Sequence, residues 1–231
     1  MNKFIQTIKS LDLPLLEQII HYEPKWINWA EQSGKNGLHY LCGITVASHP
    51  EKADASFNIL KLFLKNGMDI NSIHSIKGEC DDFPATPLWY AYTRGRNQKI
   101  WKYLLDQGAN AENCMYAIAW YDDAEAAALF KRHGASIGGS NKMDSPFFAA
   151  YNWKRYKVAE WFLQNGADVN FADSKGNTAL FYAVKKKLKR EQIELLLRFG
   201  SDFNQKNNEG ISPKDLAETN HQKNILKLFP K

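Results

Sequence analysis

Residues 145–170 read SPFFAAYNWKRYKVAEWFLQNGADVN, and this stretch predicts two short helices followed by a closing turn. Ser145 is a good N-cap because its hydroxyl can accept a hydrogen bond from a helix amide, and Pro146 follows where a missing N–H costs nothing. Apolar residues then recur at helical spacing in two sets, which the polar pair Lys154-Arg155 separates. Gly166 ends the second helix, since glycine adopts the left-handed conformation without a steric penalty.

Edited copies of this stretch occur along the whole chain. The closing turn that begins at Gly166 returns at four other places, which begin at Gly67, Gly108, Gly134 and Gly200. The first glycines of successive turns are 41, 26, 32 and 34 residues apart, a mean of about 33 residues. The box that opens the first helix also returns, in segments 36–41, 86–91, 178–183 and 212–217. A period of this length indicates a repeat protein.

This pattern resembles the ankyrin repeat, in which a T-P-L-H-x-A box opens the first helix and G-A-D-V-N follows the second. The resemblance covers essentially the whole chain, which is similar in this respect to stand-alone, bacterial-type ankyrin proteins. It implies an all-α fold: an ankyrin-repeat solenoid of stacked helix-turn-helix units with short β-hairpin-like fingers, in a curved, L-shaped stack. We expect six or seven helix pairs, caps included, in a single domain over residues 1–231, each pair burying its apolar face against its neighbours.

The closing turns and boxes set the expected unit boundaries. The first unit is an N-terminal cap, and polar residues on one side of the last unit mark a C-terminal cap. The units cover residues 1–28, 29–71, 72–111, 112–137, 138–170, 171–204 and 205–231.

Three units depart from the common length. About ten extra residues in the second unit predict a loop over 43–56 and a helix over 57–65. The finger of the third unit is extended over 71–86, with an acidic tip and one exposed aromatic residue, Phe83; it is either a contact arm or a solvated loop. The unit 112–137 has lost the Gly-x-Thr-Pro turn, so its finger is expected to be missing or tight.

Composition indicates a soluble chain with a sizeable core, since 44% of residues are hydrophobic and no run approaches the ~18 apolar residues of a membrane span. Polar residues interrupt the apolar stretch near the N-terminus before it could act as a secretory signal. The cysteines, Cys42, Cys80 and Cys114, are odd in number and scattered, which suits reduced thiols in a cytosol. We expect a cytoplasmic monomer without a membrane partner; delivery to another cell as an effector is an open alternative.

Motifs for catalysis are absent from the sequence: it contains no G-x-S-x-G, no Walker-type glycine loop, no H-E-x-x-H and no C-x-x-C. We expect no catalytic residues, no cofactor and no metal. His74 and Cys80 share the long finger, but two ligands without a second pair rarely make a metal site. His39 occupies the box position at which, by the resemblance, a histidine hydrogen-bonds within the turn, so its expected role is structural.

The resemblance also implies where a partner binds. In ankyrin proteins the second and third residues after the small residue that closes each box lie on the concave side of the stack, together with the finger tips. Tyr, Trp and Arg are enriched in binding hot spots. The alternative for the aromatic positions is simple packing on neighbouring helices. The candidate partner-binding residues are Thr93, Arg94, Tyr121, Asp122, Asn152, Trp153, Arg155, Lys185, Lys186, Lys142, Asp144 and Lys175.

These features favour a non-enzymatic module that binds an unidentified protein through its concave face and finger tips. The alternative is binding of nucleic acid or another polyanion through the basic C-terminal units, with Trp153 stacking on a base and Arg155, Lys185 and Lys186 on phosphates. The pI near 8.9 falls short of the value above 9 typical of dedicated nucleic-acid binders.

Charge is unevenly distributed along the chain. Lys and Arg number 12 against 11 Asp and Glu in residues 1–110, 2 against 4 in 111–140, and 16 against 10 in 141–231. The excess of positive charge in residues 141–231 either attracts an acidic partner or serves only to keep the repeat array soluble.

Overall fold

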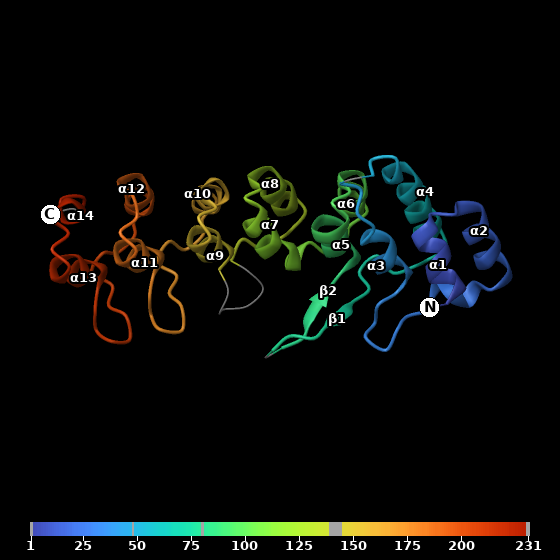
Figure 1. Ribbon diagram of the computed structural model, residues 1–231, viewed down its shortest axis with the longest axis horizontal. Helices are drawn as coiled ribbons and strands as arrows, with labels where there is room; N and C mark the ends of the chain where they lie inside the picture. Colours follow the sequence, from blue (N-terminus) through green and yellow to red (C-terminus); the bar gives the residue numbers. More distant parts are fainter. Residues whose placement is uncertain (1, 48, 80, 139–144, 230–231) are drawn as a thin grey trace. The chain divides into compact units, whose positions relative to one another are not determined.

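The computed structural model describes residues 2–47, 49–79, 81–138 and 145–229, and it is mostly helical (Figure 1). The chain divides into two compact units. Unit 1 comprises residues 1–114 with 132–135, and unit 2 comprises residues 115–131 with 136–231. In the described residues the helices form seven successive pairs, which agrees with the predicted number.

Unit 1 holds the first three pairs. They are α1 (Lys3–Ser10) with α2 (Leu13–Tyr22), α3 (Gly37–Cys42) with α4 (Lys52–Lys65), and α5 (Pro87–Tyr90) with α6 (Gln98–Asp106). Shorter turns are η1 (Pro24–Ile27), η2 (Ala91–Gly95), which continues α5 with π-helical hydrogen bonds, and η3 (Glu112–Cys114). The strands β1 (His74–Ile76) and β2 (Phe83–Ala85) pair antiparallel, with Ser75 opposite Pro84.

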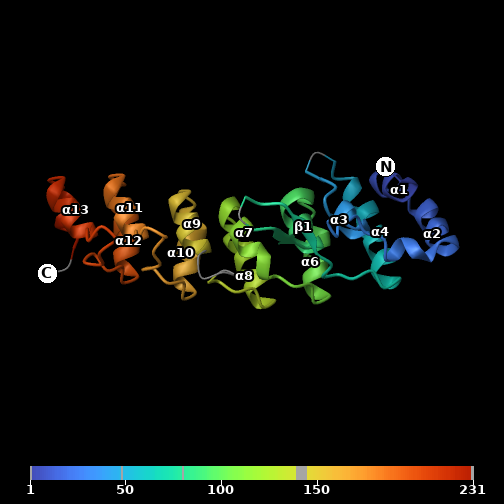
Figure 2. The same ribbon diagram turned by 90° about the horizontal axis from the view of Figure 1, so that it is seen from below.

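Unit 2 holds the remaining four pairs, apart from the last residue of α8. They are α7 (Met115–Tyr121) with α8 (Ala124–Arg132), α9 (Pro146–Asn152) with α10 (Tyr156–Gln164), α11 (Ala179–Lys185) with α12 (Arg190–Arg198), and α13 (Pro213–Thr219) with α14 (Lys223–Leu226). We call the first member of each pair the first helix and its partner the second helix. Figures 1 and 2 show that the first helices α9, α11 and α13 lie in one row of unit 2.

Hydroxyl side chains begin the first helices of unit 2, as the sequence predicts. Ser145 and Thr178 each accept a hydrogen bond, at 3.2 Å, from the N–H of the third residue of α9 and α11. Ser212 and Asp215 form a reciprocal capping box at the start of α13. Each cap is worth about 1 kcal/mol, since it satisfies an amide that has no partner within the helix.

The closing turns link neighbouring repeats through their last residue. Gly166 has φ +92°, the left-handed conformation expected of it. In unit 1, Asn71 Oδ1 accepts a hydrogen bond from the N–H of Asn110 at 2.7 Å. In unit 2, Asn170 Oδ1 accepts one from the N–H of Asp202 at 2.8 Å. The asparagine that ends each of these turns therefore holds the next turn in register.

Each unit has an apolar core between its helices. The side chains of each core come from both helices of a pair. Within a unit each pair therefore covers the apolar face of the next, as expected of a solenoid. Fully buried examples are Leu38, Leu60 and Leu104 in unit 1 and Phe147, Val158 and Leu196 in unit 2.

The helix predicted over 57–65 starts earlier than expected, because α4 begins at Lys52. The prediction that 43–56 is entirely loop was therefore wrong. Ser56 lies buried inside α4, where its hydroxyl donates to the carbonyl of Lys52 at 2.7 Å and accepts from Asn97 Nδ2 at 3.0 Å. Serine is a mediocre helix former, and here a bond to a residue 41 positions away outweighs that local preference.

The long finger is the hairpin β1–β2, which lies below α5 in Figure 1. Phe83 was predicted to be exposed, and this was wrong: it is half-buried against Trp89, with ring centroids 5.2 Å apart. Asp82 accepts hydrogen bonds from Ser75 and Lys77 across the hairpin. Where the unit 112–137 has lost its turn motif, the 3₁₀ turn η3 precedes α7 directly.

His39 fixes the base of this finger to α3, which confirms its structural role. Its Nε2 lies 3.1 Å from the carbonyl of Ala85, and its Nδ1 accepts from the N–H of Asn36 at 3.2 Å. A neutral ring with its proton on Nε2 satisfies both contacts. Burial disfavours the charged ring and lowers the pKa of His39 to about 4.

We expect acid to destabilise unit 1 through His39. Its pKa is about 4 when folded and 6.5 in the reference state, so the unfolded chain binds the proton more tightly. Stability that is fully present above about pH 6.5 is therefore lost as pH falls toward 4, by up to about 3 kcal/mol. Urea unfolding followed by circular dichroism at several pH values measures this loss.

The matched variants are His39→Gln and His49→Gln, since His49 is exposed on the loop before α4. His39→Gln should lower the stability at neutral pH and flatten its fall with acid, whereas His49→Gln should leave the profile of the parent protein. An unchanged acid dependence in His39→Gln would show that other groups cause it.

Candidate functional site

The structure places the predicted contact residues at the C-terminal ends of the first helices, next to the loops that lead to the second helices. Tyr121 and Asn152 are the last residues of α7 and α9, and Asp122 and Trp153 follow them directly. Lys185 is the last residue of α11. These residues all belong to unit 2.

Two candidates, Thr93 and Arg94, belong to unit 1. The hydroxyl of Thr93 donates to the carbonyl of Trp89 at 2.7 Å, which ties it to its own helix. Arg94 is exposed, with its guanidinium carbon 5.9 Å from the ring centroid of Trp89.

An aromatic cluster of Tyr116, Trp120 and Trp153 lies on α7 and α9. The Trp153 ring centroid is 5.0 Å from that of Tyr116 and 5.0 Å from that of Trp120, with interplanar angles of 83° and 80°. Such edge-to-face contacts are favourable for aromatic rings. Tyr116 and Trp120 nevertheless remain 46% and 51% exposed, and the adjacent Tyr121 is 40% exposed. The cluster is therefore packed within unit 2 and open to a ligand at the same time.

The sequence analysis named Tyr121 and Trp153 but missed Tyr116 and Trp120. Tyr116 and Trp120 are four residues apart in α7, so they share one face of the helix. This four-residue spacing can be recognised from the sequence alone. What the sequence does not show is that Trp153, 33 residues further on, meets this face. The predicted alternative, in which Trp153 packs on a neighbouring first helix, describes its ring contacts correctly.

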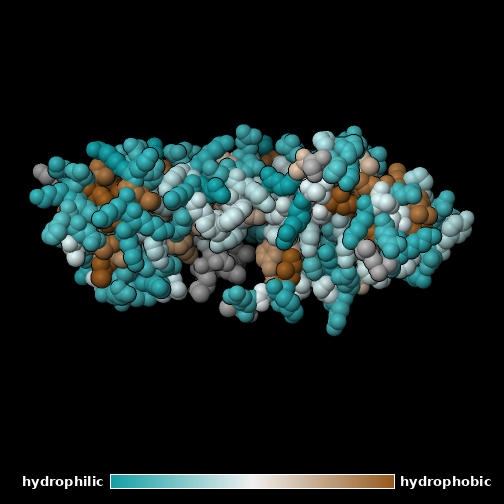
Figure 3. All heavy atoms as spheres, viewed as in Figure 1, coloured by the Kyte–Doolittle hydropathy of each residue, from teal (hydrophilic) through white to brown (hydrophobic). Residues whose placement is uncertain are grey.

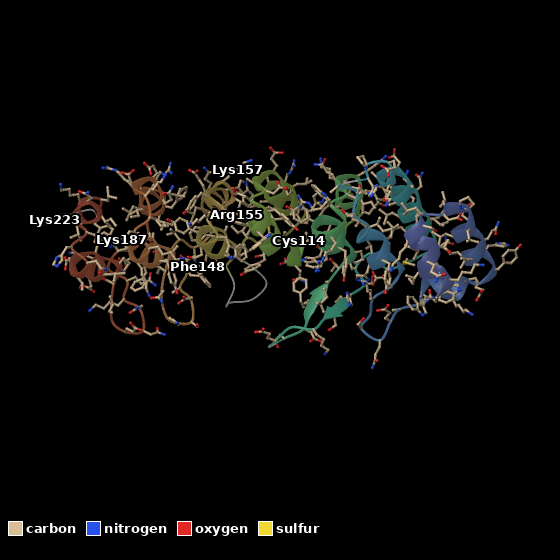
Figure 4. All side chains as sticks on the ribbon, viewed as in Figure 1. Cys114, Phe148, Arg155, Lys157, Lys187 and Lys223 are labelled. Carbon is tan, nitrogen blue, oxygen red and sulfur yellow. The ribbon has the colours of Figure 1, made fainter. Side chains whose placement is uncertain are left out.

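Arg155 extends the aromatic cluster towards the loop between α9 and α10 (Figure 4). Its guanidinium carbon lies 5.8 Å from the Trp120 ring centroid, a cation–π distance. Its Nε is buried, and no described residue accepts a hydrogen bond from it. Within the described chain, ring packing and not a carboxylate holds this guanidinium in place.

Asp122 and Asn152 have internal partners. Asp122 has φ +55°, and its Oδ1 accepts a hydrogen bond at 2.8 Å from the N–H of Val158, the third residue of α10. It therefore caps the helix of the following pair. Asn152 Nδ2 donates to the carbonyl of Phe148 at 3.1 Å, within α9.

An open depression of about 480 Å³ lies on the finger side of α9, where Figure 4 shows Phe148. Tyr116, Trp153 and Phe171 are among the residues that line it. Asp173 also reaches it, but its carboxylate already accepts hydrogen bonds from the hydroxyl of Tyr182 and from two backbone amides. Four of the ten lining residues are aromatic.

The basic candidates in unit 2 are exposed. Lys185 ends α11 and Lys186 follows as its C-cap residue, with its Nζ 5.3 Å from the Tyr182 ring centroid. Lys175 lies in the finger turn, where its backbone N–H donates to Asp173. Lys142 and Asp144 lie outside the described residues.

The thiols and potential metal ligands do not assemble into a site in the part of the chain that is described. No group of three or more His, Cys, Asp or Glu residues converges there. Cys42 and Cys114 are buried, and burial raises the pKa of both thiols, which keeps them protonated and poorly nucleophilic. His74 Nδ1 lies 2.7 Å from the hydroxyl of Tyr90, while Cys80 lies outside the described residues.

Comparison with known proteins identifies the repeat. Residues 146–230 match the family model for ankyrin repeats in three copies. Over 82 residues, 35% of this chain, the sequence is 37% identical to alpha-latroinsectotoxin-Lt1a of Latrodectus tredecimguttatus. The match spans only 6% of that toxin.

Solved structures extend the likeness to the whole chain. The ankyrin repeat domain of human ASB11 aligns with a TM-score of 0.71 and 19% identity, covering 100% of this chain and 99% of that domain. The ankyrin repeat domain of Bcl-3, a member of the IκB protein family, aligns with a TM-score of 0.74 and 17% identity, covering 99% and 97%. The whole chain therefore has the fold of an ankyrin-repeat domain, and residues 146–230 match the repeat in sequence as well. Ankyrin-repeat domains are generally protein–protein interaction modules.

In the described residues, no helix combines the length and apolarity that crossing a membrane requires.

We expect Asp122→Ala to destabilise unit 2 by about 1 kcal/mol, because it removes the cap on α10 and places alanine at a left-handed position. Asp122→Asn keeps the side-chain acceptor and tolerates this conformation, so it should cost less than about 0.5 kcal/mol. Urea unfolding of both variants gives the comparison. Equal losses in the two would mean that the carboxylate charge matters and the cap does not.

Proposed function

We propose that this protein is a non-enzymatic binding module and that a protein partner docks on the aromatic cluster of unit 2. One observation carries the proposal: among the large apolar side chains exposed in the described residues, Tyr116, Trp120 and Tyr121 lie on one short helix. Exposed apolar residues scattered singly are ordinary, whereas a contiguous group marks an interaction surface.

The chemistry of the cluster suits a protein partner. Tyrosine and tryptophan bury a large area at low entropic cost and keep a polar group for hydrogen bonding. Arg155 adds a cation at the edge of the rings. In our proposal Lys175, Lys185 and Lys186 belong to the wider contact surface of unit 2, and Thr93, Arg94, Lys142 and Asp144 remain predictions. The expectations of a monomer and of a cytoplasmic location also remain predictions.

Nucleic acid is the alternative ligand of this face. The exposed rings beside Arg155, and the exposed Lys185 and Lys186 of the next pair, favour it, since stacking platforms and cations together bind single strands. Asp122 and Asp123 oppose it, because they place two carboxylates in the loop that follows the cluster, where a phosphate backbone would meet like charge.

The test is capture of a partner by the purified chain, with and without nuclease, followed by affinity measurement with the captured protein. Trp120→Ala removes an exposed ring of the cluster, and we expect about 30-fold weaker binding, the loss typical of a hot spot worth about 2 kcal/mol. Tyr22→Ala is the matched control, because Tyr22 is 79% exposed on α2 of unit 1.

Three outcomes separate the hypotheses. Selective loss in Trp120→Ala and in Trp153→Ala supports the proposal. Equal affinity of Trp120→Ala and Tyr22→Ala overturns the location of the site. If nuclease removes every captured species and binding to a purified oligonucleotide collapses between about 50 and 200 mM salt, the ligand is nucleic acid.

A further inference from the structure

Three consecutive loops of unit 2 carry an unusual concentration of positive charge. They are the loops from first to second helix together with the adjoining helix ends, residues 152–158, 184–190 and 219–224, and we call these segments the basic edge. They contain three, five and one Lys or Arg, nine in all, and no Asp or Glu, although Glu191 and Glu218 directly adjoin them and Arg190 pairs with Glu194. A surface that serves only solubility normally mixes positive and negative side chains. The excess of positive side chains in these segments therefore calls for another explanation.

The lysines of the basic edge are available to a ligand. Lys154, Lys187, Lys189 and Lys223 are exposed, and none of them forms an ion pair with another described residue. Figure 4 shows Arg155, Lys187 and Lys223 on successive helix pairs of unit 2. In Figure 3 the surface over α11–α14 carries many hydrophilic side chains, with hydrophobic patches between them.

The starts of the second helices add to this charge. In the preceding pair, Asp123 Oδ1 accepts from the N–H of Ala126 and so caps α8. By contrast Arg155 and Lys189 occupy the N-cap positions of α10 and α12 without making a capping hydrogen bond, and only α10 has a substitute cap, from Asp122. A helix N-terminus already carries partial positive charge, so basic residues there are unfavourable within the chain. A bound anion would relieve that repulsion.

The spacing of the loops sets the form of the ligand. Packed helices lie about 8–10 Å apart, so the loops of successive pairs recur at about 10 Å. An extended peptide in the polyproline II conformation rises about 3.1 Å per residue with three residues per turn, so that every third side chain faces the same way and meets a new loop. Three loops span about 20 Å, which corresponds to about seven residues.

We propose that the basic edge binds an extended acidic segment of a protein partner, with a carboxylate at about every third residue. This proposal deepens the proposed function and rests on it: Arg155 belongs both to the aromatic cluster and to the basic edge, so one partner can contact both. A short peptide fits better than a nucleic acid, because the loop of the pair before Arg155 carries Asp122 and Asp123 and so does not continue the basic edge. A longer phosphate backbone would be repelled by these two carboxylates.

The probes are two fluorescent peptides of identical composition, measured by anisotropy with the full chain at about 50 mM salt, where screening is modest. In one peptide three glutamates stand at every third position among Gly and Ser; in the other they are contiguous. We expect the spaced peptide to bind at least about threefold more tightly, and its affinity to fall as salt rises. Equal affinity of the two peptides, or no binding of either, overturns the proposal.

Charge reversal locates the site. Lys187→Glu/Lys223→Glu changes two loops of the basic edge, and we expect about tenfold weaker binding of the spaced peptide. Lys206→Glu/Lys214→Glu is the matched control, since both lysines are exposed in unit 2 outside the basic edge and the change in net charge is the same. Equal losses in the two double variants would show a non-specific charge effect and overturn the proposal.

A second variant separates binding from folding. Lys189→Asp supplies the missing N-cap of α12, so we expect a higher thermal midpoint together with weaker peptide binding. If the variant binds as tightly as the parent protein, the basic edge is not the site.

The two proposals can fail separately. If Trp120→Ala weakens capture of the protein partner but the spaced peptide does not bind, the proposed function stands and the acidic ligand is wrong. If the peptide binds through the basic edge but Trp120→Ala leaves partner capture intact, the aromatic site is wrong. If a single-stranded oligonucleotide of equal charge binds the basic edge more tightly than the peptide, the ligand is a nucleic acid and this inference falls.

Discussion

The structure depends on the fact that a helix pair of this size cannot cover its own apolar face. Leu104 and Phe147 are fully buried because helices of their own and of adjacent pairs cover them. Polar bonds set the register of this packing: Asn170 reaches the turn of the next pair, and the buried Asn177 accepts from Asn207 Nδ2 at 2.9 Å. Hydrophobic burial supplies the stability of the stack, and these asparagines fix the register between neighbouring helix pairs.

A consequence is that the loop ends of the pairs are free to differ. The left-handed residue after the first helix is Asp122 in one pair, Lys154 in the next and Lys187 after that. Asp122 uses this position to cap α10. A lysine side chain cannot accept a hydrogen bond. Lys154 and Lys187 therefore cannot cap α12 and α14, the second helices of the next pairs, as Asp122 caps α10. The chain forgoes about 1 kcal/mol per missing cap in this region, which is a cost that stability alone does not explain.

Local features of the sequence were enough to predict the repeats, because caps and turns are set by residues within one unit. Ser145 and Gly166 act as their types predict. The failures involve contacts between helix pairs of the same unit. Ser56 continues α4 through its bond to Asn97, and Trp153 completes a cluster with Tyr116 of the preceding pair. Neither partner can be identified from spacing, since the register between pairs is a property of the assembled stack.

Arg155 shows how the two surfaces of unit 2 are related. Its guanidinium packs on Trp120 and has no carboxylate partner in the described chain, although an isolated cation so placed gains only about 0.5–1 kcal/mol from the ring. A tryptophan face leaves the positive charge largely unneutralised, and it also orients the guanidinium at the border between exposed rings and the lysine-bearing loops. A ligand with an apolar group followed by carboxylates would neutralise this charge and cover the rings together. The order of those groups along the ligand then follows from the order of the repeats, with the apolar group at α7 and the carboxylates towards α14.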